Sequence, residues 1–434
     1  MQTLVAAALV SAVLAAPASA TTLEQAFAQS YASDAAIQAG EAQLRAAGFE
    51  VESAKSGYKP EVDFEAGLGT AHNDLASPLF PISSYPLNTR TAGLTITQPL
   101  YSGGQTASKV HAARATESAE SARLSATEEQ VFLQVVQSYS RVVRDQAVLG
   151  LEQNNLDVLN QQLQATQAQF ENGEVTHTDV AQAEARVAAA QAALIQAQGS
   201  LTESRAAYQR IVGSEPQALE QPLLPVPLPQ SQTQAVQLSG ENFPVLAARF
   251  AQNAAEQQVQ ATAGKQRPQI ALTGQLLETR DPQIFLSRMD TRSIMLTLSV
   301  PIYSGGALRA DQQAAEQRAQ ASRDDLLDAE RQARLDAVNA WQSFQTAEAR
   351  LTAIQSQVQA EQIAARGVRD EQEVGERTTL DVLNADQELL DARVNLIRAR
   401  RDRLMAAYSL QAATGHLTAE TLHLQATHDG QPRG

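Results

Sequence analysis

The stretch "PLYSGGQ" at Pro99–Gln105 returns 202 residues later as "PIYSGGA" at Pro301–Ala307. Short alternating apolar runs precede each copy, and a long proline-free segment follows it. Proline has no amide donor and suits the last rung of a strand, whereas paired glycines permit a backbone turn into a helix. The motif therefore predicts a strand-to-helix junction that occurs twice. The predicted junction residues are Pro99, Tyr101, Gly103, Gly104, Pro301, Tyr303, Gly305 and Gly306.

The other side chains of the junction add two expectations. Ser102 is expected to cap the following helix with Gln105 completing a capping box, whereas Ser304 lacks the equivalent partner. Tyr101 and Tyr303 are expected at one common level, as aromatic residues are at the rim of a membrane barrel. An ordinary loop with a chance aromatic residue would explain one copy, but it explains two copies in register poorly.

The same offset relates other landmarks, which indicates that the chain is internally duplicated. The turn "GEVTHTDV" from Gly173 matches "GERTTLDV" from Gly375. Upstream of the junctions the offset becomes 208, which pairs "KPEVDFEAGL" from Lys59 with "RPQIALTGQL" from Arg267. The predicted organisation is a signal peptide at 1–20, a first repeat at 21–213, a connector at 214–240, a second repeat at 241–415 and a tail at 416–434.

Each repeat carries two candidate strands. Residues 62–69 alternate apolar with polar or small side chains, which predicts a strand with one apolar face, and 94–97 give its partner. The second repeat offers 270–276 and 294–300. The sequence thus predicts four strands of about nine residues, long enough to cross an outer membrane when tilted. The intervening 71–89, rich in proline and small polar residues, predicts an irregular loop.

Long helices are expected after both junctions, because no proline interrupts more than a hundred residues in either repeat. From Gly104 to Phe170 one helix would reach about 100 Å. Its narrow apolar seam needs other helices to bury it. The predicted fold class is therefore α+β, mainly α, built from two helix-strand-strand-helix halves.

Composition and net charge limit the cellular compartments and the binding partners that fit this protein. The net charge of -15 argues against a nucleic-acid partner, since phosphate binding needs concentrated Lys and Arg. The lack of cysteine excludes disulfides and Cys-ligated metals. The first twenty residues are uncharged, end on a small-x-small site and predict an export signal. Beyond them no apolar run is long enough for a helical membrane span, so a membrane would have to be crossed by strands.

Together, the duplicated halves, the strand pairs, P-[LI]-Y-S-G-G and G-E-x-T-x-x-D-V resemble the TolC-like outer-membrane efflux proteins. The resemblance implies a homotrimer whose twelve-stranded β-barrel lies in the lipid of a Gram-negative outer membrane and continues as a long α-helical barrel through the periplasm. It also implies a periplasmic adaptor (membrane fusion) protein and an inner-membrane pump of ABC or RND type as partners. The implied function is an exit duct for small molecules or proteins, in tripartite efflux or type I secretion.

The G-E-x-T-x-x-D-V turns have a structural interpretation of their own. Gly173 and Gly375 are expected to end one helix, and Thr176 and Thr378 to cap the next. An aspartate follows each threonine by three residues, at Asp179 and Asp381. Its negative charge is expected to stabilise the amino terminus of the helix.

By the resemblance, the same turns form a periplasmic gate. Asp179, Arg377 and Asp381 match gate positions of the family. Gln372 stands where a tyrosine is expected, and Asn384 where a second aspartate is expected. Because acidic rings in a three-fold assembly select cations, a gate with these two replacements is expected to be held less tightly and to block cations less.

The sequence contains no convincing catalytic, cofactor or metal motif. Six histidines lack ligand spacing, and no G-x-S-x-G, Walker or G-x-G-x-x-G motif is present, so neither an enzyme nor a cofactor is predicted. The basic run Arg398–Arg403 is expected to pair with neighbouring acids rather than to bind an anion. The alternative function is a structural or adhesive trimeric coiled coil without a pore, although such a stalk would not need tandem halves.

Overall fold

The computed structural model describes residues 21–424, apart from 78–79, 226 and 284–285. The predicted signal peptide at 1–20 and residues 425–434 of the predicted tail lie outside this range. The elements in chain order are α1 Leu23–Ser33, α2 Ala35–Ser56, β1 Glu61–Ser77, β2 Phe80–Tyr101, α3 Gln105–Glu171, α4 His177–Val212, α5 Gln232–Leu238, the 3₁₀ helix η1 Ser239–Glu241, α6 Phe243–Gly264, β3 Gln269–Gln283, β4 Leu286–Ser299, α7 Ala307–Glu373 and α8 Thr379–Ala413.

Corresponding helices of the two halves have matching lengths. α3 and α7 each span 67 residues, and α4 and α8 span 36 and 35. The long helices predicted after the two junctions are therefore confirmed. A continuous ladder of this length is possible because no proline removes an amide donor from it.

The chain folds into two compact units, and each unit takes segments from both halves. Within the described residues, we call them the helical unit, with 21–38, 125–242 and 332–424, and the sheet unit, with 39–124 and 243–331. The unit boundaries thus cut across the predicted repeats and pass through α3 and α7.

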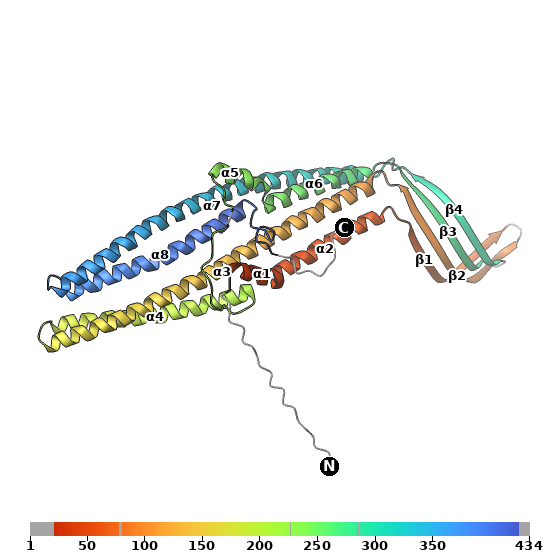
Figure 1. Cartoon of the computed structure of the whole chain (residues 1–434). Helices are drawn as coiled ribbons and strands as arrows, with labels where there is room; N and C mark the ends of the chain where they lie inside the picture. Colours follow the sequence, from red (N-terminus) through yellow and green to blue (C-terminus); the bar gives the residue numbers. More distant parts are fainter. Residues whose placement is uncertain (1–20, 78–79, 226, 284–285, 425–434) are drawn as a thin grey trace, which may run out of the picture. The chain divides into compact units, whose positions relative to one another are not determined.

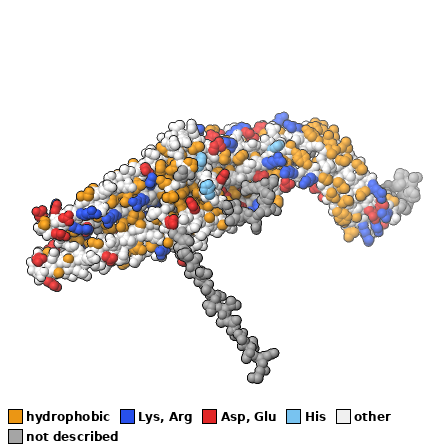
Figure 2. Space-filling view, in the orientation of Figure 1, with side chains coloured by type: hydrophobic (Ala, Val, Ile, Leu, Met, Phe, Trp, Pro, Cys, Tyr) orange, Lys and Arg blue, Asp and Glu red, His pale blue; other side chains and the backbone are white. Residues whose placement is uncertain are grey.

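The sheet unit contains one antiparallel sheet in the order β1-β2-β3-β4 (Figure 1). The register places Phe64 opposite Leu94 and Leu94 opposite Leu276, so these side chains share one face. Phe64 is 70% exposed, and Leu68 and Ile294 are 85% and 83% exposed. Hydrophobic side chains accordingly cover much of the strands in Figure 2. An exposed apolar band of this extent is typical of a surface that faces lipid or another protein.

The strands are longer than the predicted nine residues, at 17, 22, 15 and 14 residues. The irregular loop predicted at 71–89 is wrong, because β1 and β2 remain paired as far as Ser77 and Phe80. β3 pairs with β2 only from Arg90 onward, so the preceding part of β2 has one open edge. Proline is tolerated at an open edge, where its missing amide removes no ladder hydrogen bond.

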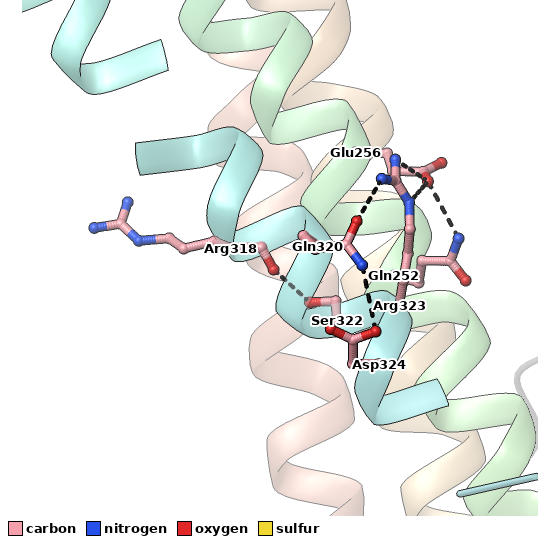
Figure 3. A network of polar contacts seen from close by, with 7 residues as sticks. All are labelled: Gln252, Glu256, Arg318, Gln320, Ser322, Arg323 and Asp324. Carbon is pink, nitrogen blue, oxygen red and sulfur yellow. Dashed lines mark hydrogen bonds and ion pairs between the residues drawn. The ribbon is translucent and has the colours of Figure 1, made fainter. Parts of the chain in front are cut away.

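Ion pairs join the helices of the sheet unit beside the strands. Arg323 on α7 donates through Nε and Nη2 to Glu256 Oε1 on α6, at 3.1 and 3.0 Å (Figure 3). Gln252 donates to the same oxygen at 3.1 Å, and Gln320 accepts from Arg323 Nη1 at 3.4 Å. The hydrogen bonds from Gln252 and Arg323 lower the pKa of Glu256. The network stays largely exposed, so it orients α6 against α7 more than it stabilises them.

Aromatic side chains form the centre of the helical unit. Phe27 of α1 meets Phe132 of α3 edge to face, with ring centroids 5.6 Å apart, and also contacts Tyr408 of α8. Tyr139 and Tyr208 are fully buried in the same cluster. The apolar seam of α3 is thus buried by other helices, as predicted, because an Ala- and Gln-rich helix exposes too little apolar surface to fold alone.

The predicted connector at 214–240 is more ordered than its composition indicated. It contains α5, capped by Ser231, whose Oγ accepts from Gln234 N at 3.2 Å. Leu219 also forms an isolated bridge with Thr21. Within the described residues, no helix combines the length and the apolarity that a membrane-spanning helix requires.

Candidate functional site: two helical turns and two strand-to-helix junctions

The first helical turn joins α3 to α4 in the helical unit. Gly173 has a φ of +78°, a conformation that glycine adopts without strain. Thr176 Oγ1 accepts from Asp179 N at 3.4 Å, while Asp179 Oδ2 accepts from Thr176 N at 2.8 Å and from Thr176 Oγ1 at 2.7 Å. The predicted cap is confirmed, and Asp179 itself completes a capping box.

The second turn, between α7 and α8, repeats this geometry. Gly375 has a φ of +80°. Asp381 Oδ2 accepts from Thr378 N at 3.0 Å and from Thr378 Oγ1 at 2.8 Å, and Thr378 Oγ1 accepts from Asp381 N at 3.2 Å. Hydrogen bonds from the capping threonine hold the pKa of both aspartates below the usual range, and Arg377 adds to the effect on Asp381. Both turns therefore display a carboxylate that stays charged.

The expected gate residues have partners within their own chain. Arg377 Nε donates to Glu371 Oε2 at 2.8 Å, and Gln372 Nε2 donates to Thr379 Oγ1 at 3.3 Å. The pKa of Arg377 is raised, mainly by Glu371 and less by Asp381. Sequence analysis missed Glu371, because nothing in the local pattern marks a contact made across the turn.

The two helix pairs meet near their turns. Arg186 Nη2 of α4 donates to Asn384 Oδ1 of α8 at 2.8 Å. An apolar cluster of Leu159, Val187 and Leu383 lies beside this bond. Acidic side chains gather at the turn ends of both pairs (Figure 2). The structure thus brings Asn384 and both turns to one end of the helical unit (Figure 1). Arg186 also belongs to this site, although no feature of the sequence indicated it.

The first junction, in the sheet unit, is closely packed. Gly103 and Gly104 have φ values of +65° and +86°. A Cβ on Gly103 would lie 2.4 Å from the carbonyl oxygen of Gly264, and Arg267 Nη1 donates to Gly103 O at 3.3 Å. Only glycine fits here, because both the φ value and the neighbouring backbone exclude a side chain.

The cap of this junction differs from the prediction. Ser102 Oγ accepts from Thr106 N at 3.3 Å and lies 2.9 Å from Thr106 Oγ1, so the partner is Thr106 and not Gln105. β2 also continues past Pro99 to Tyr101, with a register shift between them, so Pro99 is not the last rung. α3 begins at Gln105, two residues later than a capping box at Ser102 would require.

The second junction has the same backbone but different surroundings. Gly305 and Gly306 have φ values of +63° and +88°, and a Cβ on either would meet no described atom within 4 Å. Tyr303 is 89% exposed, against 47% for Tyr101. β4 ends at Ser299, so Pro301 lies beyond the strand and is not its last rung, contrary to the prediction. The two copies of one motif therefore share the backbone turn at their glycines but differ in where the strand ends and in what packs against them.

No group of three or more His, Cys, Asp or Glu side chains that could hold a metal ion occurs in the described part of the chain.

The chain is similar in sequence and in fold to known outer-membrane proteins. The model of the family "Outer membrane efflux protein" matches residues 26–214 and 235–416. The chain is 34% identical to the outer membrane efflux protein BepC of Brucella suis, over 93% of this chain and 87% of BepC. It is 27% identical to the outer membrane protein TolC of Vibrio cholerae, over 92% of each. The fold matches the solved structure of CusC with a TM-score of 0.80 at 20% identity, over 91% of this chain and 92% of CusC.

The family model and these relatives define the class of the protein, a Gram-negative outer-membrane channel that extends into the periplasm. The chain belongs to the outer membrane efflux protein family. That family consists of transport channels, which favours the predicted duct over the alternative of a structural or adhesive stalk.

Proposed function

We propose that three copies of the chain assemble into one export duct, in which the four-stranded sheets join into a closed ring of twelve strands. β1 and β4 each have a single neighbour and therefore present an open edge. In an antiparallel sheet of four strands the first and last run in opposite directions, so β4 of one copy can pair antiparallel with β1 of the next. Closure would satisfy both edges, as lipid requires.

The observation that carries the proposal is the difference between the two junctions. The first junction is packed by Gly264 and Arg267, which belong to the other repeat. The 208-residue offset makes Ser56 and Lys59 their counterparts in the first repeat. Within one chain nothing described packs closely on Gly305. In a closed ring, Ser56 and Lys59 of a neighbouring copy would reach the second junction as Gly264 and Arg267 reach the first.

Because the chain has no cysteine, disulfide cross-linking can test this contact directly. The variant Ser56→Cys with Ala307→Cys should form disulfides between copies and give covalent trimers on a non-reducing gel. The matched pair Gly264→Cys with Gln105→Cys joins positions in contact within one chain, so it should give cross-linked monomers only. Monomers alone from the first pair in the folded protein, or oligomers from the second, would contradict the ring.

The duct would pass substrates to the outside from an inner-membrane pump of ABC or RND type through a periplasmic adaptor. BepC is named for outer membrane efflux, and its similarity covers nearly the whole chain, which supports this role. The two capped turns would form the periplasmic gate. Asp179 and Asp381 would recur as charged rings there, with Gln372 and Asn384 beside them and Arg377 positioned to contact a neighbouring copy.

Single-channel conductance in planar bilayers tests the gate. Removing the arginine and its nearby carboxylate in the variant Arg377→Ala, Asp381→Ala should enlarge a small cation-selective current. Glu371→Gln is the control, since it removes only the partner of Arg377 within the chain. If Glu371→Gln opens the channel as much as the double variant, the pairing within one chain holds the gate. Unchanged current in both variants would place the constriction elsewhere.

A further inference from the structure

A cavity of about 280 Å³ lies in the helical unit between α3, α7 and α8, beside the connector. One part of its wall is apolar, with Val143, Leu351 and Ile397 among its members. Gln221 and Pro222 of the connector line another part. The volume is close to the lower limit for small-molecule sites, which are typically apolar with a few converging polar groups.

The charged residues that line this cavity all carry the same sign. They are Arg144 of α3 and Arg400, Arg401 and Arg403 of α8. No Asp or Glu among the described residues lines it, although the whole chain carries a net charge of -15. A positive wall in an acidic protein favours an anionic occupant, because arginine side chains that line one cavity repel one another wherever no carboxylate pairs with them.

The predicted pairing of the basic run with nearby acids accounts for only part of this charge. Arg401 Nη1 contacts Asp402 at 3.1 Å, and Arg403 contacts Glu348. Arg144 contacts Asp145 at 2.7 Å. These three carboxylates lie outside the cavity lining.

Two donors remain without acceptors. Arg401 Nε is buried and has no hydrogen-bond partner in the part of the chain that the structure describes. Arg400 is exposed at the same wall, and within the described residues its guanidinium forms no ion pair or hydrogen bond. A buried unpaired donor is costly, and Arg400 beside it presents an exposed guanidinium that can bind an acceptor in the cavity.

We propose that the cavity binds a small organic oxyanion, a carboxylate or phosphate ester whose charged end contacts Arg400 and Arg401 and whose apolar body lies against Val143, Leu351 and Ile397. Guanidinium groups bind such oxyanions through paired hydrogen bonds, which suits them to this ligand class. The bound anion would link α3, α7 and α8. This site is independent of the proposed gate and of ring closure.

Isothermal titration calorimetry of the full-length detergent-solubilised oligomer, with phenyl phosphate as the probe, tests the site. One molecule should bind per chain. Arg400→Gln removes no contact made within the chain and should weaken binding at least about tenfold, the effect of one lost charge-assisted hydrogen bond. Arg401→Gln should do the same. Arg398→Gln lies on the same helix but outside this cavity, so it should bind like the unmodified protein.

Two further probes separate the chemistry of the ligand. Inorganic phosphate should bind more weakly than phenyl phosphate, because it leaves the apolar wall uncovered, and uncharged benzyl alcohol should not bind measurably. No binding of phenyl phosphate, or equal binding by the two cavity variants and the unmodified protein, would overturn the proposal. Equal affinity for inorganic and phenyl phosphate would overturn the organic part of it.

Discussion

Arg186 Nη2 donates to Asn384 Oδ1 at 2.8 Å and so ties α4 to α8 within one chain. Asn384 stands where the resemblance to TolC-like proteins implies an aspartate. The acceptor is therefore neutral, whereas an aspartate at this position would form an ion pair with Arg186. A hydrogen bond to one charged group on an exposed surface contributes little, so this link between the helix pairs is weak.

Asn384→Asp should strengthen this link by turning it into an ion pair, and it should add a charge near the turns. Single-channel conductance should fall, and the difference should shrink at high salt because exposed charges are screened. Arg186→Gln should have the opposite effect on conductance. If both variants conduct like the unmodified channel, this contact does not influence the pore.

The capped aspartates lead to a prediction about pH. Hydrogen bonds from Thr176 and Thr378 lower the pKa of Asp179 and Asp381, so both should stay charged until the pH falls below the usual range for aspartate. Their contribution to folding is present above the pKa of the unfolded state and is lost as the pH falls through the lowered value. Cation selectivity, measured as reversal potential, should therefore persist in mildly acidic solution.

The variant Thr176→Val, Thr378→Val supplies the comparison. Loss of the hydroxyl contacts should raise both pKa values towards the usual range, and selectivity should then disappear at a higher pH. An identical midpoint with and without the hydroxyls would show that other groups set the selectivity.

Two buried tyrosines of the helical unit should respond differently to the same substitution. Tyr139 Oη lies 2.8 Å from Thr21 O and 2.9 Å from Glu220 O, and it donates to these carbonyls. Tyr208 is equally buried, but its hydroxyl has no hydrogen-bond partner among the described residues. Tyr139→Phe should lower the free energy of unfolding by about 1–2 kcal/mol, because it removes the hydroxyl proton that the carbonyl oxygens of Thr21 and Glu220 share.

Tyr208→Phe is the matched control and should be neutral or slightly stabilising, since it removes an unsatisfied group. Thermal unfolding followed by circular dichroism distinguishes the two variants. Equal destabilisation would mean that ring packing, rather than the hydroxyl contacts, decides the outcome.

Glu129 on α3 predicts a second dependence on pH. Burial raises the pKa of this carboxyl from 4.5 to about 8, and its Oε2 forms no hydrogen bond with any residue that the structure describes. The folded state therefore holds the proton more tightly than the unfolded state. The free energy of unfolding should be highest below 4.5 and should fall as the pH rises through about 8.

Glu129→Gln keeps the size of the side chain without the charge. It should raise the thermal midpoint by a few degrees at a pH above 8 and change it little near pH 4. A uniform shift across the pH range would mean that the carboxyl does not change its charge in the folded protein.

Local chemistry could be predicted from the sequence alone. The helix caps at Thr176 and Thr378 involve residues three apart, so the motif itself specifies the contact. The glycine turns follow from conformational freedom at single residues. Segments without proline predict the two helices of 67 residues. Alternation of apolar and polar residues predicts which side chains share the apolar face of the strands. The joint pattern was also specific enough to indicate the family.

Contacts between distant segments were decided only by the tertiary structure. Pairing with β1 extends β2 through a proline-rich stretch that its own composition marks as a loop. Arg186 reaches Asn384, 198 residues further along the chain, without any local signal. Two nearly identical junction motifs have different environments, because Gly264 and Arg267 pack against the first and nothing described packs closely on the second. Short-range propensity determines a cap or a turn, whereas strand length, ion-pair partners and the cavity beside Arg401 depend on which remote segments the fold brings together.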